Sequence, residues 1–171
     1  MTVRPIRYLG DLVLRKPAKK VSRVDDSIRR LIADMTESMY AAHGVGIAAP
    51  QIGVGLRVVV IGMPDEEPFA LINPEVIKRN GERRLDEGCL SVPGYRGTVT
   101  RSLSVVVKAL DENGREVRVK AEGDMLAQAL EHETDHVNGL LYVDRLNAKT
   151  DLVKLAAPHA APDGPEGEEE A

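Results

Sequence analysis

The sequence DMLAQALEHETDHVNG, residues 124–139, contains the strongest local pattern in this chain of 171 residues. Its apolar residues recur at helical spacing, Asp124 is a suitable N-cap, and Asn138-Gly139 is typical of a helix end. Side chains four residues apart lie on one face of a helix, so His132 and His136 should point the same way. The segment is therefore predicted to be a helix that presents two imidazoles on a single face.

Upstream of this helix the pattern predicts one more helix and two strands. Residues 25–43 carry apolar side chains at every third or fourth position and are expected to form an amphipathic helix. Residues 56–63 are short and rich in β-branched side chains, as buried strands are. Residues 69–83 read as a second strand, interrupted at Asn73-Pro74 because proline cannot donate to a sheet.

The remaining pattern is a hairpin followed by an acidic tail. Residues 103–110 and 115–122 alternate between apolar and polar side chains and are joined by a short turn that ends in glycine. Residues 156–171 are rich in Ala, Pro, Gly and Glu, and expose too little apolar surface to offset the entropy of ordering. We therefore expect one catalytic domain over residues 1–155 and a disordered tail beyond it.

Composition limits the class of protein. The net charge of −4 argues against broad nucleic-acid binding, which needs clustered cations. One cysteine cannot form an intramolecular disulfide, so a cytoplasmic location is the default expectation. No run approaches the roughly 18 apolar residues of a membrane span, and no membrane association is expected.

The histidine pair suggests a metal site that needs a further ligand. Glu133, directly after the first histidine, could take a proton from water that the metal activates. A catalytic site needs three protein ligands, and the downstream candidates, Asp144 and His159, are weak. Upstream, Cys89 lies in residues 86–97, a segment rich in Gly and Pro that reads as a loop or an irregular strand. A thiolate is a good ligand for Zn²⁺ or Fe²⁺, although a lone cysteine is more often a small buried hydrophobe.

A third segment, GVGIAAPQIG at residues 44–53, follows the first predicted helix. Its glycines permit close approach of another backbone, and Gln51 offers an uncharged amide donor. The segment could therefore contact substrate, or it could be a tight connection with Gln51 on the surface.

Together, the three segments resemble the signature motifs of peptide deformylase: GVGIAAPQ at residues 44–51, EGCLS at residues 87–91 and HETDH at residues 132–136. The resemblance extends over most of the chain. It implies an α+β fold in which antiparallel sheets pack around a central helix that carries the HExxH motif. It also implies a hydrolase that removes the formyl group from the N-terminal formylmethionine of new polypeptides and releases formate.

The resemblance also implies roles for individual residues. Cys89, His132 and His136 match the family's metal ligands, and Glu133 matches the general base that later protonates the departing amine. Gln51 and the backbone N–H of Leu90 match the donors that face the developing oxyanion. The positions that match the substrate-binding surface are Val45, Gly46, Leu85, Glu87, Met125, Gln128 and Ala129.

Four further positions bear on the site. Arg96 could meet the peptide or form a surface salt bridge, and Arg101 also falls where the family carries arginine. Asp135 points about 100° away from its neighbour His136, so it should orient a partner rather than bind metal. Gln128 replaces a position that is commonly apolar in the family, which affects the expected polarity of the pocket.

The expected cofactor is one divalent metal per chain. One thiolate and two imidazoles suit Fe²⁺, Zn²⁺, Co²⁺ or Ni²⁺, and the family usually works with Fe²⁺. The expected partners are N-formylmethionyl nascent peptides, with a monomeric enzyme. Transient association with the ribosome fits this function, but the acidic tail should repel RNA and disfavours docking through that segment.

Two other functions remain open from the residues alone. A metal-dependent endopeptidase would share the histidine helix but take its third ligand downstream. A metal-binding or interaction module without catalysis would not require Glu133 or Gln51, so their presence disfavours it.

Overall fold

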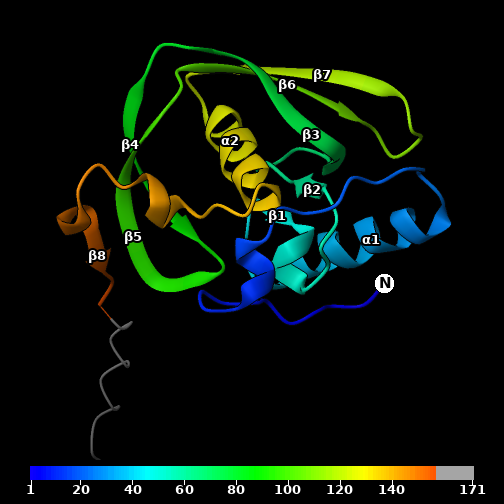
Figure 1. Ribbon diagram of the computed structural model, residues 1–171, viewed down its shortest axis with the longest axis horizontal. Coiled ribbons are helices and arrows are strands. Elements are labelled where there is room, and N and C mark those ends of the chain that lie inside the picture. The colour runs from blue at the N-terminus through cyan, green and yellow to red at the C-terminus, as the bar shows by residue number, and fades with distance from the viewer. Residues whose placement is uncertain (157–171) are drawn as a thin grey trace, which may run out of the picture.

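The computed structural model describes residues 1–156, which form an α+β fold with α2 between two antiparallel sheets (Figure 1). The α-helices are α1 (Asp26–Ala41) and α2 (Met125–Val137). Short 3-10 helices are η1 (Leu12–Arg15), η2 (Ala49–Ile52), η3 (Tyr142–Arg145) and η4 (Lys149–Asp151). The strands are β1 (Gly46–Ala48), β2 (Val58–Ile61), β3 (Phe69–Asn80), β4 (Arg83–Cys89), β5 (Val92–Arg101), β6 (Ser104–Leu110), β7 (Glu116–Glu122) and β8 (Leu152–Lys154).

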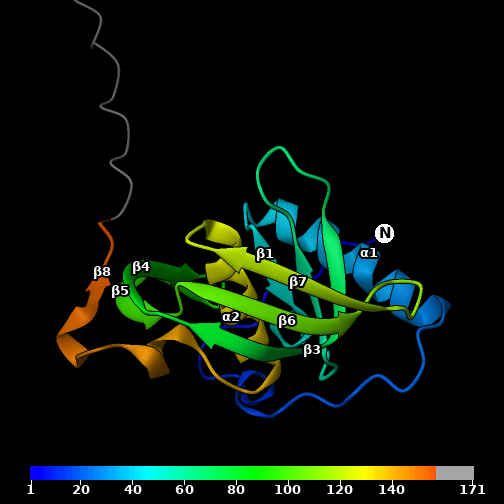
Figure 2. The same cartoon turned by 90° about the horizontal axis from the view of Figure 1, so that it is seen from above.

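The larger sheet has the strand order β1-β2-β3-β6-β7, and both of its faces are covered. Successive side chains of a strand point to opposite faces, so Val58 and Val60 pack with α1 whereas Val59 and Ile61 pack with α2. Figure 2 looks onto β3, β6 and β7, which run across α2. Aliphatic side chains thus hold α2 against one face of the sheet. The predicted α+β fold, with antiparallel sheets packed around a central helix, is confirmed.

The predicted helices and the hairpin are also confirmed. The side chain of Asp124 accepts a hydrogen bond from the Ala127 N–H at 2.8 Å, and Gly139 adopts the positive φ of 79° that commonly follows a helix. Strands β6 and β7 pair from Ser104 with Glu122 to Leu110 with Glu116. These features form where the local pattern predicts them because they depend on near neighbours in the sequence.

The interruption predicted for the strand of residues 69–83, which is β3, is present as an irregularity in pairing. The register between β3 and β6 shifts between Ile72 and Glu75, and Asn73 has a φ of 54°. The side-chain amide of Asn73 donates to the Val21 carbonyl, and its oxygen accepts from the Val21 N–H. The irregular residue thus ties the N-terminal segment to the sheet.

The segment of residues 86–97 is not a loop, so that alternative was wrong, whereas an irregular strand was correct. It contributes to β4 and β5, which pair from Arg83 with Arg101 to Cys89 with Val92, with a register shift between Glu87 and Cys89. Glycine and proline disrupt the alternation of side chains by which a strand is predicted from sequence. The two strands form nevertheless, because their backbone hydrogen bonds do not depend on that alternation. The three-stranded sheet β4-β5-β8 places Cys89 next to the face of α2 from which the two histidines project.

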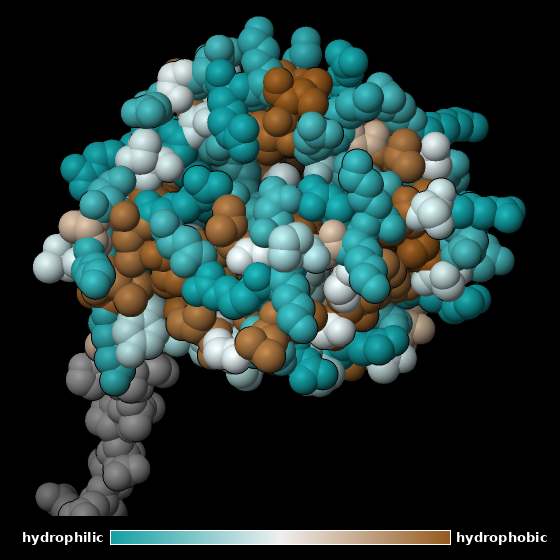
Figure 3. Space-filling view, in the orientation of Figure 1, coloured by the Kyte–Doolittle hydropathy of each residue, from teal (hydrophilic) through white to brown (hydrophobic). Residues whose placement is uncertain are grey.

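Two further sequence predictions concern membrane spans and the C-terminal tail. Among residues 1–156 no helix is long and apolar enough to cross a membrane. The surface seen in Figure 3 is mostly hydrophilic with scattered hydrophobic groups. The predicted disorder of the tail concerns residues that, apart from Ala156, lie outside the described part of the chain, so the boundary at residue 155 stays a prediction.

Candidate metal centre

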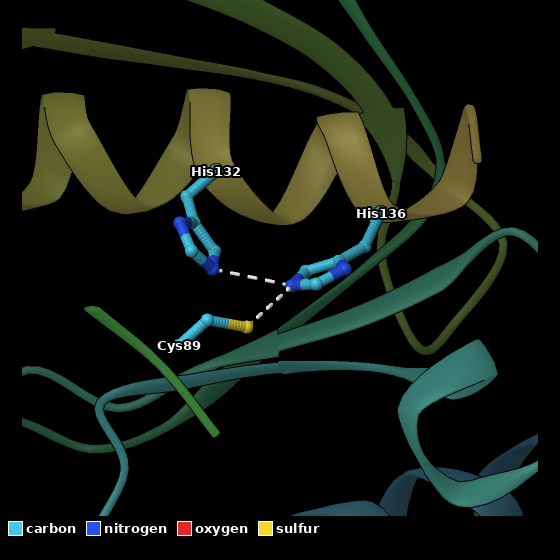
Figure 4. Close-up of side chains that lie close together, drawn as sticks. All are labelled: Cys89, His132 and His136. Atoms are coloured by element: carbon cyan, nitrogen blue, oxygen red, sulfur yellow. Dashed lines mark hydrogen bonds between the residues drawn. The ribbon is translucent and has the colours of Figure 1, made fainter. Parts of the chain in front are cut away.

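Cys89, His132 and His136 meet beside α2 with their ligand atoms all within 4.8 Å of one another (Figure 4). Nε2 of His132 lies 3.1 Å from Nε2 of His136, and Sγ of Cys89 lies 3.3 Å from the latter atom. Both imidazoles project from one face of α2, and the thiol approaches from the end of β4. The helical spacing explains why the two histidines lie together, and the pairing of β4 with β5 brings Cys89 to them.

These three side chains fit a divalent metal. Metal–ligand bonds of about 2.0–2.3 Å at tetrahedral angles would separate the ligand atoms by about 3.4–3.6 Å. Two of the three separations, 3.1 and 3.3 Å, are close to these values, and the third is within 4.8 Å. The donor set of one thiolate and two imidazoles is one that divalent transition metals prefer.

Glu87 fixes the orientation of the His132 ring. Its Oε1 is hydrogen-bonded to Nδ1 of His132, which leaves Nε2 of that ring facing the other two ligands. Arg101 donates to the same carboxylate from Nε at 3.0 Å and from Nη2 at 2.6 Å. Burial alone would raise the pKa of Glu87, but the hydrogen bonds from His132 and Arg101 lower it to about 2. Glu87 is therefore held as a carboxylate.

Arg101 joins the strand that carries the cysteine to the helix that carries the histidines. Its side chain is 2% exposed, and its Nη1 donates to Asp135 of α2 at 2.6 Å. Asp135 also accepts from Arg145 through both of its oxygens. The expectation that Asp135 contacts a partner side chain rather than the metal ligands agrees with these contacts.

Glu133 directly follows the first histidine of α2, and its side chain is buried. Its Oε2 is buried and forms no hydrogen bond within residues 1–156, and burial raises its pKa to about 7. Gly46 of β1 lies so close that an added Cβ would be 2.5 Å from Oε1. An unpartnered carboxylate beside the three ligand atoms can accept and return a proton.

Gln51 is buried, so the alternative of a surface side chain was wrong. Its Oε1 accepts from the Ala48 N–H at 2.9 Å, an interaction that assigns the amide orientation. Its Nε2 therefore faces the ligands, 3.6 Å from Sγ of Cys89 and 3.1 Å from Oγ of Ser91. A donor thus points into the site, as the sequence predicts.

A cavity of about 480 Å³ opens beside Cys89 and His132, which line it, whereas His136 does not. Leu85 does not line it but packs with the cluster around Val99 and Tyr142, because an apolar side chain gains more by burial in that small core. Arg96 lies at the wall and donates from Nε to Asp86 at 2.7 Å. Of the residues predicted to contact substrate, catalyse or bind metal, the following line the cavity: Val45, Gly46, Gln51, Glu87, Cys89, Leu90, Arg96, Met125, Gln128, Ala129, His132 and Glu133.

Several contacts escape sequence reasoning. Tyr142 is buried and stacks on the His132 ring, with centroids 6.4 Å apart. Ser91 is buried and accepts a hydrogen bond from Gln51, although it lies inside one of the quoted motifs. Asp144, the downstream ligand candidate, instead binds Arg15 and accepts from the Leu141 N–H. His159 lies outside the described residues.

Replacing Arg101 with methionine is expected to destabilise the fold by about 3–5 kcal/mol, because Glu87 and Asp135 would then keep buried charges with fewer partners. Chemical denaturation followed by circular dichroism measures the change. Arg96→Met is the matched control, since its pair with Asp86 is exposed and should contribute about 1 kcal/mol or less. An equal loss of unfolding free energy in the two variants would contradict the claim that Arg101 stabilises the fold through its buried pairs with Glu87 and Asp135.

Comparison with known proteins gives one consistent result. The family model for polypeptide deformylase matches residues 3–151. A peptide deformylase of Dehalococcoides mccartyi is 49% identical over 164 residues, which cover 95% of this chain and 98% of that protein. One of Thermomicrobium roseum is 46% identical over 160 residues, 89% of this chain and 90% of the relative.

Solved structures agree. The crystal structure of a peptide deformylase from Legionella pneumophila matches with a TM-score of 0.83 and 47% identity, and covers 88% of this chain and 89% of its own. That of a peptide deformylase from Synechococcus elongatus in complex with actinonin has a TM-score of 0.83 and 44% identity over 86% of this chain and 81% of its own. Sequence and fold are thus similar over the same region of the chain.

Proposed function

Since the chain belongs to the peptide deformylase family, whose members remove the N-formyl group from nascent polypeptides in a metal-dependent hydrolysis, we propose that the cavity beside α2 performs this reaction. The observation that carries the proposal is the convergence of Cys89, His132 and His136 beside the unpartnered carboxylate of Glu133. Cys89, His132, Glu133, Gln51 and Leu90 line the cavity, and Nε2 of His136 lies 3.1 Å from His132 and 3.3 Å from Cys89.

Cys89, His132 and His136 are the residues that would hold one divalent metal. When bound, such an ion supplies a Lewis acid that polarises a carbonyl and activates water near neutral pH. We propose Fe²⁺ as the metal in the cell, with Zn²⁺, Ni²⁺ or Co²⁺ as ions that the same donors accept. Glu87 and Arg101 keep the His132 ring turned so that Nε2 remains a ligand.

Glu133 moves the proton. It accepts a proton from the water whose oxygen adds to the formyl carbon, and it then donates that proton to the amine nitrogen as the C–N bond breaks. Formate and a free amino terminus leave. The position of Glu133 beside the ligands, with an Oε2 that has no hydrogen-bond partner within residues 1–156, supports this role.

Gln51 and Leu90 stabilise the negative charge that develops on the formyl oxygen. The Nε2 group of Gln51 faces the site because its Oε1 is held by the Ala48 N–H. The Leu90 N–H is the second donor, one residue after Cys89. Donors that are already oriented need little rearrangement when charge develops, which is the main advantage of such a site.

The substrate lies as an extended chain along β1. On a strand, backbone N–H groups two residues apart point to the same side. The Ala48 N–H points away from β2 and donates to Gln51, so the N–H of Gly46 also points away from β2. Gly46 lines the cavity, and its backbone can therefore pair with an extended peptide there. The methionine side chain contacts Val45, Glu87, Met125, Gln128 and Ala129, which line the cavity. Arg96 at the wall is a candidate contact for the following residues of the peptide.

The proposed setting is the cytoplasm, where a monomer would act on formylated chains as they leave the ribosome. Association with the ribosome would be transient and would not use the acidic residues 156–171, since these repel RNA. The single thiol ligand supports a reducing compartment.

Formate release from a formyl-Met peptide, measured on anaerobically prepared protein together with elemental analysis, tests the proposal. The expected result is stoichiometric formate, about one metal per chain and no cleavage of internal peptide bonds. The unformylated counterpart of the same peptide is the control and should remain intact. Internal cleavage of either peptide would instead identify an endopeptidase.

A further inference from the structure

Backbone hydrogen bonds connect the N-terminal segment to two residues of the site. The Arg7 N–H donates to the carbonyl of Gln51 at 2.7 Å, and the Leu9 N–H donates to the carbonyl of Ser91 at 2.8 Å. Gln51 lies in η2, whereas Ser91 lies between β4 and β5. The N-terminal segment, dark blue in Figure 1, therefore bridges η2 and the turn between β4 and β5.

The same two residues are also bonded to each other. Nε2 of Gln51 donates to Oγ of Ser91 at 3.1 Å, across 40 residues of sequence. The Ser91 N–H in turn donates to Sγ of Cys89 at 3.4 Å. Ser91 is thus held at its N–H, its hydroxyl and its carbonyl, which leaves the preceding residue, Leu90, little freedom.

The side chains of this segment do not explain its position. Those of Arg7, Tyr8 and Leu9 are all about half exposed, at 51%, 55% and 49%. Burial of apolar surface therefore contributes little to holding residues 7–9 in place. Two backbone hydrogen bonds join this segment to the site, while the Arg7 side chain lies against Gly53 and the preceding Ile6 packs on the cluster around α1.

We propose that residues 7–9 are a positioning strap for the two oxyanion donors, an inference that rests on the proposed function. The strap sets the separation between Gln51 and the Cys89–Ser91 turn, and so the separation between the Gln51 amide and the Leu90 N–H. Donors of this kind must be held within about 0.5 Å of their working position. The strap thereby acts on the transition state without touching substrate or metal.

Proline substitution tests the strap because proline removes the N–H. Arg7→Pro and Leu9→Pro are each expected to lower kcat about tenfold, less than the roughly 10²- to 10³-fold loss on removing an oxyanion donor outright. KM should change by no more than about twofold and the metal content should not change, because the donors act mainly in the transition state. Comparison with Arg7→Ala and Leu9→Ala at the same positions separates the N–H from the side chain.

Tyr8→Pro is the matched control. Within residues 1–156 the Tyr8 N–H has no hydrogen-bond partner, so a ring at this position removes neither contact of the strap. Wild-type kcat in Arg7→Pro and Leu9→Pro would overturn the proposal. An equal loss in Tyr8→Pro, or a parallel loss of metal and KM, would also overturn it and point to general destabilisation.

Hydrogen exchange on the unmodified, metal-loaded protein tests the strap without any variant. The amide protons of Arg7 and Leu9 should exchange markedly more slowly than that of Tyr8. Equal exchange at the three positions would overturn the strap. Formate release by the wild-type protein in the same preparation keeps this outcome distinct from a failure of the proposed function.

Discussion

Replacing Glu133 with glutamine is expected to leave the metal content at about one per chain and to lower kcat by about 10²- to 10⁴-fold. Glutamine has nearly the same shape but cannot accept the proton of the attacking water. Glu133 is not one of the three residues whose ligand atoms converge, so the variant should still bind the metal. Formate release under saturating substrate, together with elemental analysis of the same sample, measures both quantities.

Glu131→Gln is the matched control for this variant. Glu131 is also a buried glutamate of α2, but it binds Ser102 and Arg79 on the side away from the three ligands. Its loss should affect thermal stability and leave kcat near the wild-type value. A Glu133→Gln protein with near-normal turnover would remove Glu133 from its proposed role.

Replacing Cys89 with serine is expected to abolish both metal binding and formate release. A serine hydroxyl remains protonated near neutral pH, whereas a thiol is readily held as the thiolate ligand, so the variant keeps two strong ligands of three. Elemental analysis after dialysis should give far less than one metal per chain. Full metal content together with full turnover would show that the three-ligand arrangement is incorrect.

The fold of the Cys89→Ser variant should persist, which separates loss of metal from loss of structure. Cys89 is partly exposed at the end of β4, and the main aliphatic clusters around α1 and α2 do not include it. Far-UV circular dichroism should therefore match that of metal-free wild-type protein. Turnover that returns on addition of excess Zn²⁺ would indicate weakened affinity rather than a lost ligand.

Elements defined by near neighbours could be predicted from the sequence, and those defined by distant partners could not. The two helices follow from caps and apolar spacing, and the β6–β7 hairpin follows from alternation around a turn. An irregular strand over residues 86–97 was one of two alternatives, but the pairing of β4 with β5 could not be predicted, because Gly and Pro weaken the alternation and stability comes from pairing with β8 and packing against η3.

The site divides in the same way. Helical spacing brings His132 and His136 together, whereas Cys89 could be assigned only through the resemblance of three motifs. The contacts of Arg101 with Glu87 and Asp135 span 14 and 34 residues, and no local pattern contains them. The hydrogen bonds from residues 7–9 are made by backbone atoms, which leave no trace in residue types.

The short length of β1 bears on solubility as well as on substrate binding. An exposed strand edge can pair with another chain and start aggregation, and β1 lies at one edge of the five-stranded sheet. Here the strand is three residues long, and the side chain of Gln51 occupies the outward N–H of Ala48. The 3-10 helix that begins at Ala49 then turns the chain away. In the proposed function the edge accepts a few residues of an extended peptide, yet it is too short to act as a template for self-association.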